Sequence, residues 1–257
     1  MAIPGSSSAT TVTEPAGRAP AALTPAGPMP WQTARVVAIR RETARAKTFR
    51  LALPGPSLHR AGQHYVVRLT APDGYTASRS YSVASAPDGS PEFELTVERL
   101  EGGEVSTFLH DVVEAGDELE VRGPIGKWFV WDGGIPAILV GGGSGVVPLM
   151  SMLRLARATP RSPLVRMVAS VRRPGDLYYA DELLGPETTV VYTREAPNGP
   201  GRPVGRLTAD DLARIVRPDA WAYVCGSSGF ADHASHLLVE LGLPIGQIRV
   251  ARFGATA

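Results

Sequence analysis

The sequence is poor in the residues that build metal sites and disulfide frameworks. It has one cysteine, Cys225, in 257 residues, which excludes an intrachain disulfide, a thiolate-bound iron–sulfur cluster and an all-cysteine zinc site. The five histidines are scattered without metal-ligand spacing. Any redox chemistry of this chain must therefore come from an organic cofactor. Because a lone thiol fits the reducing cytosol, we expect a cytoplasmic protein.

The chain also lacks a strong net charge and a long apolar run. Its formal net charge of +1 produces no strong field that would attract nucleic acid or a membrane surface. No apolar run reaches the roughly 18 residues that a membrane span needs. Hydrophobic residues make up 44% and charged residues 20% of the sequence, which is typical of a globular protein without a nucleic-acid partner or a membrane span.

Residues 1–29 contain almost no large apolar side chains and are rich in Ala, Pro, Gly, Ser and Thr. Such a stretch cannot bury enough surface to offset its chain entropy, so we expect a disordered arm. The alternative, a targeting peptide, would need a basic start and an apolar centre, and neither is present.

The stretch 30–131 has the pattern of a small antiparallel β-barrel. Its β-rich runs end in Pro/Gly turns, and they read ARVVAIRRET, AKTFRLALP, HYVVRLTAP, RSYSVASAP, EFELTVERL and DELEVRG. Near-alternation of apolar and polar residues predicts half-buried strands. With one helix-like piece, GEVSTFLHDVV, these runs predict a closed or nearly closed barrel.

The stretch 132–257 instead alternates strands with helices, which predicts a parallel sheet covered on both faces. The expected strands are AILV, LVRMVAS, TTVVYTRE, AWAYVCG and QIRVARFG. The expected helices are VVPLMSMLRLARA, DLYYADELL, LARIV and FADHASHLLVELG. Thr208 and Asp211 form a capping-box pattern before LARIV. The predicted fold class is therefore two-domain β + α/β: an N-terminal antiparallel β-barrel followed by a parallel-sheet α/β domain of the type that binds nucleotides.

A glycine-rich turn, GGGSGVVP at 141–148, follows AILV and opens a predicted helix. Glycines let the backbone approach a ligand closely, and the free N–H groups of a helix N-terminus favour a diphosphate. Pro148 falls in the first helical turn, where proline is tolerated. The spacing is GxGxxP rather than the GxGxxG dinucleotide fingerprint, so alone it leaves open a tight turn without a ligand.

A second motif, RSYSVAS at 79–85, lies in a predicted strand of the barrel. Arg79 is a permanent cation suited to a phosphate, Tyr81 offers a flat face for a conjugated ring, and Ser82 offers a hydroxyl. The two-residue period of a strand places Arg79 and Tyr81 on one face, with Ser80 and Ser82 on the other. Taken alone, this pattern favours an ordinary strand with an exposed arginine and a packed tyrosine.

Further glycine motifs occur at predicted turns. GGEVST at 102–107 enters a short helix, whose amides and the hydroxyls of Ser106 and Thr107 could receive a second diphosphate or form a capped loop. CGSSGF at 225–230 ends a predicted parallel strand, at the sheet edge where such folds bind ligands. Its thiol could lie beside a reacting ring or serve as a small buried hydrophobe. GPIG marks the exit from the barrel.

The order of the motifs is more specific than any one of them. RSYSVAS, GGEVST, GPIG, GGGSGVVP, CGSSGF and a terminal ARFG resemble the ferredoxin–NADP reductase family of flavoproteins, from about Trp31 to Phe253. The resemblance implies that NAD(P)H reduces a bound FAD, which passes electrons to a separate redox protein such as a ferredoxin or an oxygenase component. Family members often carry a cysteine-rich ferredoxin domain, and with one cysteine we expect this chain to lack it.

The resemblance also implies roles for individual residues. Arg79 would bind a flavin phosphate, Tyr81 would stack on the isoalloxazine, and Ser82 would lie near its N5, with Ser80 in the same flavin-binding strand. Ser82 and Cys225 are expected at the hydride-transfer step. The remaining assignments are Gly103, Val105, Ser106 and Thr107 for the FAD diphosphate, Gly142, Gly143, Gly145 and Pro148 for the nicotinamide cofactor's diphosphate, Cys225, Gly226 and Ser227 for the nicotinamide ring, and Phe253 for the flavin's other face.

The choice between NADPH and NADH depends on the end of the second parallel strand. There Arg172 and Arg173 follow Ser170, where a 2′-phosphate would arrive, and no acidic residue ends the strand to bind a free ribose diol. Arg194, after the third strand, could add to this pocket. These residues favour NADPH, with NADH possible, although arginines are also common on exposed loops.

One residue departs from the family pattern. Many relatives read ERFG near this terminus, and Ala251 stands here in place of the acid, which puts a proton-relay role at this position in doubt. Two other functions stay open: a flavin reductase that releases reduced flavin, and a non-catalytic flavin-binding regulatory subunit. The two predicted diphosphate loops, with Tyr81 and Ser82, argue against the regulatory subunit, since a non-catalytic binder does not need two facing cofactor sites.

Overall fold

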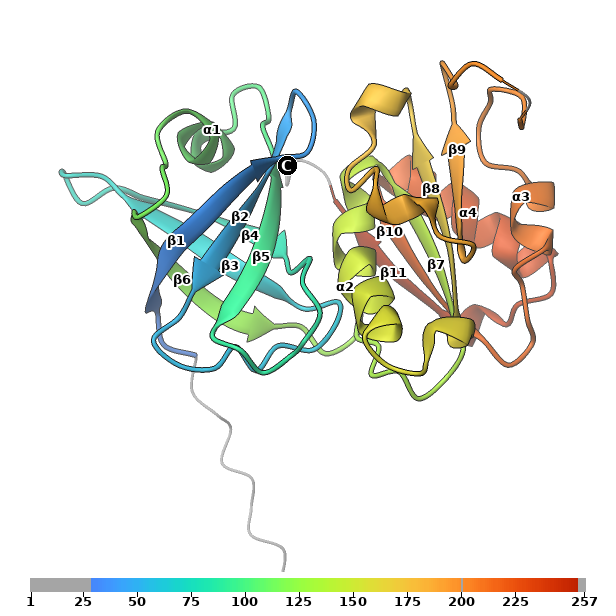
Figure 1. Ribbon diagram of the computed structural model, residues 1–257, viewed down its shortest axis with the longest axis horizontal. Coiled ribbons are helices and arrows are strands. Elements are labelled where there is room, and N and C mark those ends of the chain that lie inside the picture. Colours follow the sequence, from blue (N-terminus) through green and yellow to red (C-terminus); the bar gives the residue numbers. More distant parts are fainter. Residues whose placement is uncertain (1–28, 200, 254–257) are drawn as a thin grey trace, which may run out of the picture.

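The computed structural model describes residues 29–199 and 201–253, so nearly all of the arm predicted at 1–29 lies outside it. The first part of the described chain is an antiparallel six-stranded sheet in the order β4-β3-β6-β1-β2-β5. A bridge between Val83 and Leu95 joins its two edge strands, so the sheet closes into the predicted barrel (Figure 1). Its strands are β1 (Gln32–Arg41), β2 (Ala46–Ala52), β3 (His64–Thr70), β4 (Thr76–Ser82), β5 (Glu92–Glu98) and β6 (Glu118–Ile125).

The barrel interior is filled by the inward side chains of alternating strand positions. Phe49 and Leu51 of β2 are almost fully buried, and the rings of Tyr65 and Phe93 stack with centroids 4.2 Å apart. Full burial of each such side chain stabilises the fold by about 1.5–3 kcal/mol. Helix α1 (Glu104–Asp111) packs its buried residues against this interior.

The second part of the chain is a parallel sheet in the order β11-β10-β7-β8-β9. Because the chain leaves β7 toward β8 and later returns to β10 on the other side, the strand order reverses between β7 and β10. Open α/β sheets bind ligands at the carboxyl ends of such a pair. The strands are β7 (Ala137–Gly142), β8 (Val165–Val171), β9 (Thr188–Tyr192), β10 (Trp221–Gly226) and β11 (Ile248–Arg252).

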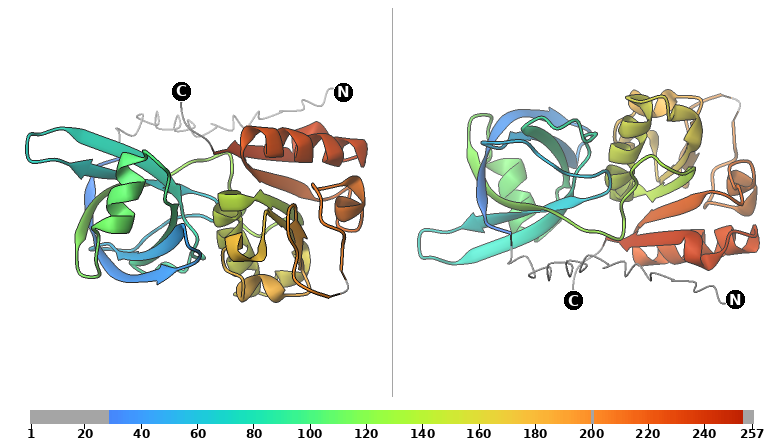
Figure 2. Two further views of the ribbon diagram at one scale, coloured as in Figure 1. Left: turned by 90° about the horizontal axis from the view of Figure 1, so that it is seen from above. Right: turned by 90° about the horizontal axis from the view of Figure 1, so that it is seen from below.

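Helices cover both faces of the parallel sheet, as the alternating pattern predicted. Helix α2 (Val146–Arg157) lies on the face toward the barrel, whereas α3 (Ala209–Ala213) and α4 (Ser228–Glu240) lie on the other face (Figures 1 and 2). Short 3₁₀ turns complete the layers: η1 (Gly143–Gly145), η2 (Ser162–Leu164), η3 (Pro174–Asp176), η4 (Glu182–Leu184) and η5 (Ile245–Gln247). None of the helices in the described ranges is long and apolar enough to cross a membrane.

One predicted helix is wrong. DLYYADELL forms turns and the short η4 instead, because Tyr179 adopts a positive φ of 54°, which an α-helix does not contain. Tyr178 and Tyr179 are both buried there, so tertiary packing overrides the local pattern. The capping box is confirmed, since Asp211 accepts a hydrogen bond from the Thr208 N–H at 2.7 Å.

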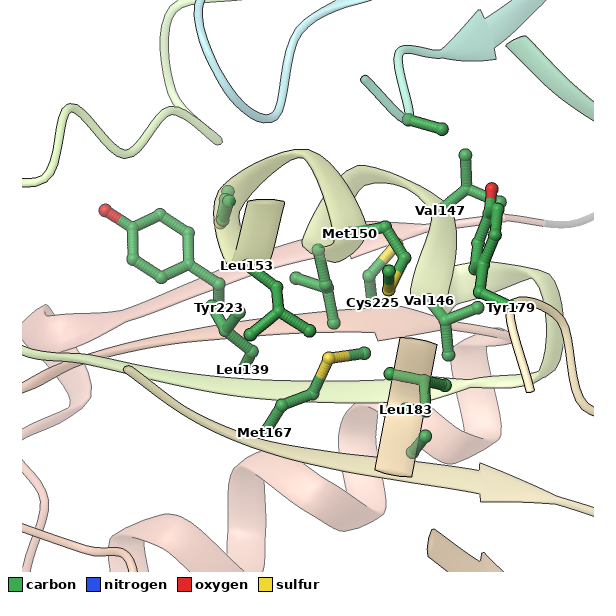
Figure 3. Close-up of a cluster of buried hydrophobic side chains, with 14 of the residues drawn as sticks. Leu139, Val146, Val147, Met150, Leu153, Met167, Tyr179, Leu183, Tyr223 and Cys225 are labelled. Atoms are coloured by element: carbon green, nitrogen blue, oxygen red, sulfur yellow. The ribbon is translucent and has the colours of Figure 1, made fainter. Parts of the chain in front are cut away.

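The barrel and the parallel sheet share a core. The buried side of α2 packs on the sheet with Leu139, Met167 and Cys225, as Figure 3 shows. Ala46, Ala61 and Ala84 of the barrel belong to the same cluster. Helix α2 is therefore the layer through which the two halves meet.

Candidate functional site

The glycine-rich turn lies at the strand-order reversal. Cys225 of β10 is paired in register with Gly141 of β7, so both strands end side by side. A Cβ at Gly145 would lie 2.2 Å from the Cys225 carbonyl oxygen, and one at Gly142 would lie 2.6 Å from the Phe230 ring. Close packing against β10 and α4 therefore excludes any side chain at Gly142 and Gly145.

Gly143 is different, because its backbone is open. Its φ is +55°, and a Cβ there would meet no atom within 4 Å. Helix α2 continues the η1 turn and has no side-chain cap at Gly145. The Val146 N–H bonds to the Gly143 and Ser144 carbonyls, so the exposed backbone at Gly143 is the part of this turn that is open to a ligand. Pro148 lies in the first turn of α2 and is buried. An exposed backbone beside a helix N-terminus, with its positive dipole, fits a diphosphate.

The loop after β10 is arranged differently from the loop after β7. Ser227 is the N-cap of α4, and its hydroxyl accepts a hydrogen bond from the Phe230 N–H at 3.4 Å. The Phe253 N–H donates to the Gly226 carbonyl at 2.8 Å, so the terminal aromatic predicted over the flavin lies beside the residues predicted around the nicotinamide. Ala251 is paired with Cys225 in the register of β10 and β11.

Cys225 is fully buried in the core shared by α2 and the sheet. Figure 3 shows it next to Val146 and Met150. Burial raises the pKa of the thiol, so Cys225 is a neutral thiol near pH 7. The residue therefore lies at the paired ends of β7 and β10, with its side chain in an apolar setting.

The first four residues of RSYSVAS lie in β4, and the last three follow the strand. Tyr81 is opposite Tyr65 in β3, and Ser82 is opposite His64. Tyr81 is half-buried, and burial raises its pKa to about 12, so the phenol stays neutral. Arg79 is exposed, and its Nη1 donates to the Ser78 carbonyl at 2.7 Å. Its guanidinium has five donors in all, which leaves capacity for a phosphate.

Ser80 lies on the outward face of β4, opposite Val66 of β3, and is exposed. Together the strand presents a cation, a neutral aromatic face and hydroxyls within four consecutive residues. This combination fits a phosphorylated, conjugated ligand.

In the turn before α1, some of the groups predicted to bind a phosphate form hydrogen bonds within the turn itself. The Ser106 hydroxyl donates to the Gly103 carbonyl and accepts from the Leu100 N–H, both at 3.1 Å. The Thr107 N–H bonds to the same Gly103 carbonyl at 2.8 Å, and Val105 is buried. The first-turn amides of α1, which has no side-chain cap, are the groups left for an anion.

A groove of about 990 Å³ runs beside this turn, between α1 and the β3–β4 hairpin. Its lining includes Gly103 and Thr107 of the predicted loop, with Tyr75 of the hairpin. That volume lies in the range of small-molecule sites. Arg79, Tyr81 and Ser82 belong to β4 of this hairpin but do not line the groove, so the groove includes only one part of the predicted flavin site.

The predicted arginines gather at the carboxyl ends of β8 and β9. The Arg194 N–H donates to the Arg172 carbonyl at 3.0 Å, and both side chains are exposed, as is Arg173. Glu195, which no sequence motif indicated, has its carboxylate 3.5 Å from the Arg173 guanidinium. An exposed ion pair of this kind contributes only about 0–1 kcal/mol, so a phosphate can compete with it.

Two polar residues of α2 that no sequence motif indicated bond to the barrel. The Ser151 hydroxyl donates to the Ser85 carbonyl at 2.6 Å, and Arg154 donates to the Ala84 carbonyl at 3.0 Å and to Glu94 at 2.7 Å. These bonds cross from the α/β half to the barrel. A serine and an arginine three residues apart within the apolar stripe VVPLMSMLRLAR are the signal that marks them.

Comparisons with known proteins agree with this geometry. Residues 33–130 match the family model of the oxidoreductase FAD-binding domain, and residues 139–236 match that of the oxidoreductase NAD-binding domain. Ferredoxin–NADP reductase B of Sorangium cellulosum is 34% identical over 238 residues, which cover 86% of this chain and 96% of that protein. The propane 2-monooxygenase reductase component of Rhodococcus jostii is 31% identical over 199 residues, or 72% of this chain and 53% of that protein.

Solved structures show the same two-part fold. The flavohem-like FAD/NAD-binding domain of nitric oxide dioxygenase from Vibrio cholerae superposes with a TM-score of 0.76 at 24% identity, covering 87% of this chain and 99% of that one. A ferredoxin reductase in carbazole 1,9a-dioxygenase gives 0.74 at 25% identity, covering 90% of this chain and 71% of that one. The chain spans about half to two thirds of the length of several reductase components that it matches.

Proposed function

The chain belongs to the ferredoxin–NADP reductase family of FAD- and NAD-binding oxidoreductases, and from this premise we propose that it oxidises NADPH through FAD and passes the electrons to a separate redox protein. The observation that carries the proposal is the position of α2. Its first turn follows the glycine-rich turn at 141–145, and its Ser151 bonds to the residue that ends RSYSVAS. In this proposal one helix would connect the two cofactor sites.

When bound, FAD supplies the electron chemistry: it takes up hydride from the nicotinamide and releases electrons. In this proposal Arg79 and the first-turn amides of α1 balance the charge of its diphosphate. Tyr81 offers a neutral aromatic surface to the ring system, and Ser82 offers a hydroxyl at its edge. Ser80 lies in the same strand with its side chain exposed to solvent.

On the nucleotide side, the backbone at Gly143 and the first turn of α2 would hold the diphosphate of the nicotinamide cofactor. Cys225, Gly226 and Ser227 would border its ring, with Phe253 beside Gly226. The buried Cys225 supplies a neutral, apolar support under the ring, which helps to exclude water from the reacting atoms. In this division residues 30–131 serve the flavin and residues 132–257 serve the nicotinamide nucleotide.

We assign NADPH as the reductant because Arg172, Arg173 and Arg194 converge at the strand ends where the ribose would lie. Arginine is suited to a phosphate monoester, because it offers a planar fork of donors. Glu195 neutralises part of this charge, so NADH remains a slower substrate in the proposal.

The acceptor is assigned from the relatives. Those at 30–32% identity include the reductase component of a propane 2-monooxygenase and the reductase subunit of a glycine betaine monooxygenase. We therefore propose an oxygenase component or a ferredoxin as the partner of this chain.

The purified protein tests the proposal directly. We expect it to be yellow, to release FAD on denaturation, and to lose its flavin absorbance when NADPH is added without oxygen. A protein that takes up no flavin, or that releases only FMN, would contradict the FAD assignment. FAD that separates from the protein during gel filtration would favour a flavin reductase over a reductase for a protein acceptor.

A further inference from the structure

Helix α2 makes direct bonds to the strand end that follows the flavin motif. Ser151, which is fully buried, donates to the Ser85 carbonyl at 2.6 Å. One turn further on, Arg154 Nη1 donates to the Ala84 carbonyl at 3.0 Å. Ala84 and Ser85 follow Ser82 by two and three residues in the sequence, so a shift of α2 moves the chain next to the predicted flavin contacts.

Arg154 uses the rest of its guanidinium to connect both halves. Its Nη1 also donates to Glu94 of β5 at 2.7 Å, while Nε and Nη2 form a bidentate pair with Glu182 of the α/β half at 2.8 and 2.5 Å. The cation lies 5.1 Å from the ring centroid of Tyr179. Only a planar fork of donors can meet these acceptors at once, and a lysine ammonium cannot.

Tyr179 extends the connection to the barrel. Its hydroxyl is 2.5 Å from the Thr96 hydroxyl, and its N–H donates to Glu42 at 3.2 Å. Tyr179 holds a positive φ of 54°, which costs a non-glycine residue energy and persists only where the surroundings fix it. Arg154 therefore packs over a tyrosine whose own backbone is held in one conformation.

A buried ionic network is poor evidence for stability, because the desolvation of the charges offsets their attraction. Here burial opposes the charge of Arg154, but bonds to Glu182 and Glu94 raise its pKa overall. The side chain is 16% exposed. The role of Arg154 is therefore better explained by the orientation it imposes on α2 and the barrel than by a contribution to the free energy of folding.

We propose that Arg154 is a positioning residue for hydride transfer, which fixes α2 and its nucleotide crevice relative to the flavin strand. The inference rests on the proposed function, because it concerns how the two rings meet. Displacing reacting groups by about 1 Å can slow a reaction roughly a hundredfold. Because Arg154 joins the Ala84 carbonyl, Glu94 and Glu182, it sets the distance between the two reacting rings without contacting either cofactor.

The chain contains a matched control on the same helix. Arg157 lies one turn after Arg154 and pairs with Glu187 through its Nε at 2.6 Å. The side chains of this pair are 30% and 8% exposed, so it is buried to a similar degree. Both partners belong to the α/β half. Arg157→Met therefore removes a comparable ion pair without cutting the connection to the barrel.

The first experiment needs no cofactor turnover. Hydrogen exchange is followed in the segment 84–95, where the Ala84 N–H bonds to the Glu94 carbonyl and the Glu94 N–H bonds to the Ser85 hydroxyl. We expect faster exchange in Arg154→Met than in the parent and the parent rate in Arg157→Met. Equal exchange in all three proteins would overturn the inference.

The second experiment measures flavin bleaching by saturating NADPH in a stopped-flow instrument. We expect Arg154→Met to bleach roughly 10- to 100-fold more slowly, with FAD content, NADP⁺ affinity and ferricyanide reoxidation of the dithionite-reduced protein as in the parent. Arg154→Lys should recover little of the rate, and Arg157→Met should bleach like the parent. Equal slowing in the two methionine variants would show a structural role only.

If Arg154→Met does not fold, Ser151→Ala provides the same test, because it deletes one bond across the same contact. An unchanged bleaching rate and unchanged exchange in Ser151→Ala would then overturn the inference. If NADPH fails to bleach the parent protein, the proposed function is wrong, whereas the exchange experiment still decides whether Arg154 holds the two halves together.

Discussion

The two faces of the parallel sheet are packed in different ways. The face toward α3 and α4 is covered by an apolar cluster that includes Leu207, Leu212 and Leu238. The face toward the barrel carries α2, whose Ser151 and Arg154 bond to the barrel from within a mostly apolar layer. The first face has the composition of a hydrophobic core. The second face adds hydrogen bonds and ion pairs that hold the barrel in place. We therefore expect substitutions on the first face to change mainly the stability of the fold. Substitutions on the second face should change mainly the alignment of the two bound rings.

The largest effect should follow from a cavity on the outer face. Leu238 of α4 is fully buried, so Leu238→Ala should destabilise the protein by about 2–5 kcal/mol. Urea unfolding measures this loss. At a temperature where the variant is folded, flavin bleaching by NADPH should keep the parent rate. A slower rate in the folded variant would show that this face also controls alignment.

On the inner side, substitutions at the predicted ring contacts should change rate more than stability. Ser82→Ala and Cys225→Ala are expected to slow bleaching by as much as about a hundredfold, because the two rings lose their alignment. Flavin content and the fold should remain.

Cys225 makes this comparison sharper, because its side chain is part of the shared core. If the thiol is only core filler, Cys225→Ala should lower the melting temperature and leave the bleaching rate unchanged. Such a result, together with a parent-like rate in Ser82→Ala, would remove both residues from the hydride-transfer site.

A smaller effect is expected at the exposed carboxyl end of β8. Replacing Arg172 and Arg173 by Ala removes charge-assisted hydrogen bonds worth roughly 1.5–3 kcal/mol each. NADPH should lose at least about tenfold in kcat/KM while NADH changes little. Arg217→Ala, an exposed arginine paired with Asp219 away from the strand ends, is the control. Equal losses for both nucleotides would mean that the two arginines have a structural role.

The smallest expected effect is a loss of stability at low pH. It involves one carboxylate on each side of the parallel sheet, Glu182 and Asp211. Burial would raise the pKa of Glu182, but the hydrogen bond and charge of Arg154 lower it overall. The same balance with Arg202 and Thr208 lowers the pKa of Asp211 beside α3. A carboxylate whose folded pKa lies below its unfolded value stabilises the fold above the unfolded pKa. That contribution is lost as the pH falls through the folded pKa.

We therefore expect the free energy of unfolding to decrease as the pH falls below about 5, by at most about 1 kcal/mol for each group after solvent screening. Glu182→Gln and Asp211→Asn should each flatten this slope. Only acid titration of the Glu182 contact should speed hydrogen exchange in the segment 84–95. An acid response there that survives Glu182→Gln would assign it to another group.

The strands and most helices could be predicted because their signals are local. Alternation in AKTFRLA, the apolar run AILV and the Thr208 and Asp211 capping box each act within a few residues. The turn at Tyr179 could not be predicted, since its positive φ depends on partners such as Glu42. The contacts of Arg154 with Ala84 and Glu94 join residues 70 and 60 positions apart, a pairing that exists only once both halves are folded.

The candidate site was predictable to a different extent at each loop. The glycines of GGGSGVVP could be found because a turn leading into a helix demands them, but their separate reasons could not: packing at Gly142 and Gly145, and backbone conformation at Gly143. The internal use of the Ser106 hydroxyl was equally hidden, because it depends on the fold of the loop back to Leu100.

The Phe230 ring beside Gly142 and Gly226 has a consequence for protein engineering. A Cβ added at Gly142 or Gly226 would lie 2.6 or 2.7 Å from that ring, so these two glycines accept no substitution without a compensating change at Phe230. Libraries that randomise these two positions would therefore return mostly destabilised variants. Attempts to convert the protein from one nicotinamide nucleotide to the other should sample the exposed carboxyl ends of β8 and β9 instead, where Arg172, Arg173 and Glu195 can change without disturbing the packing.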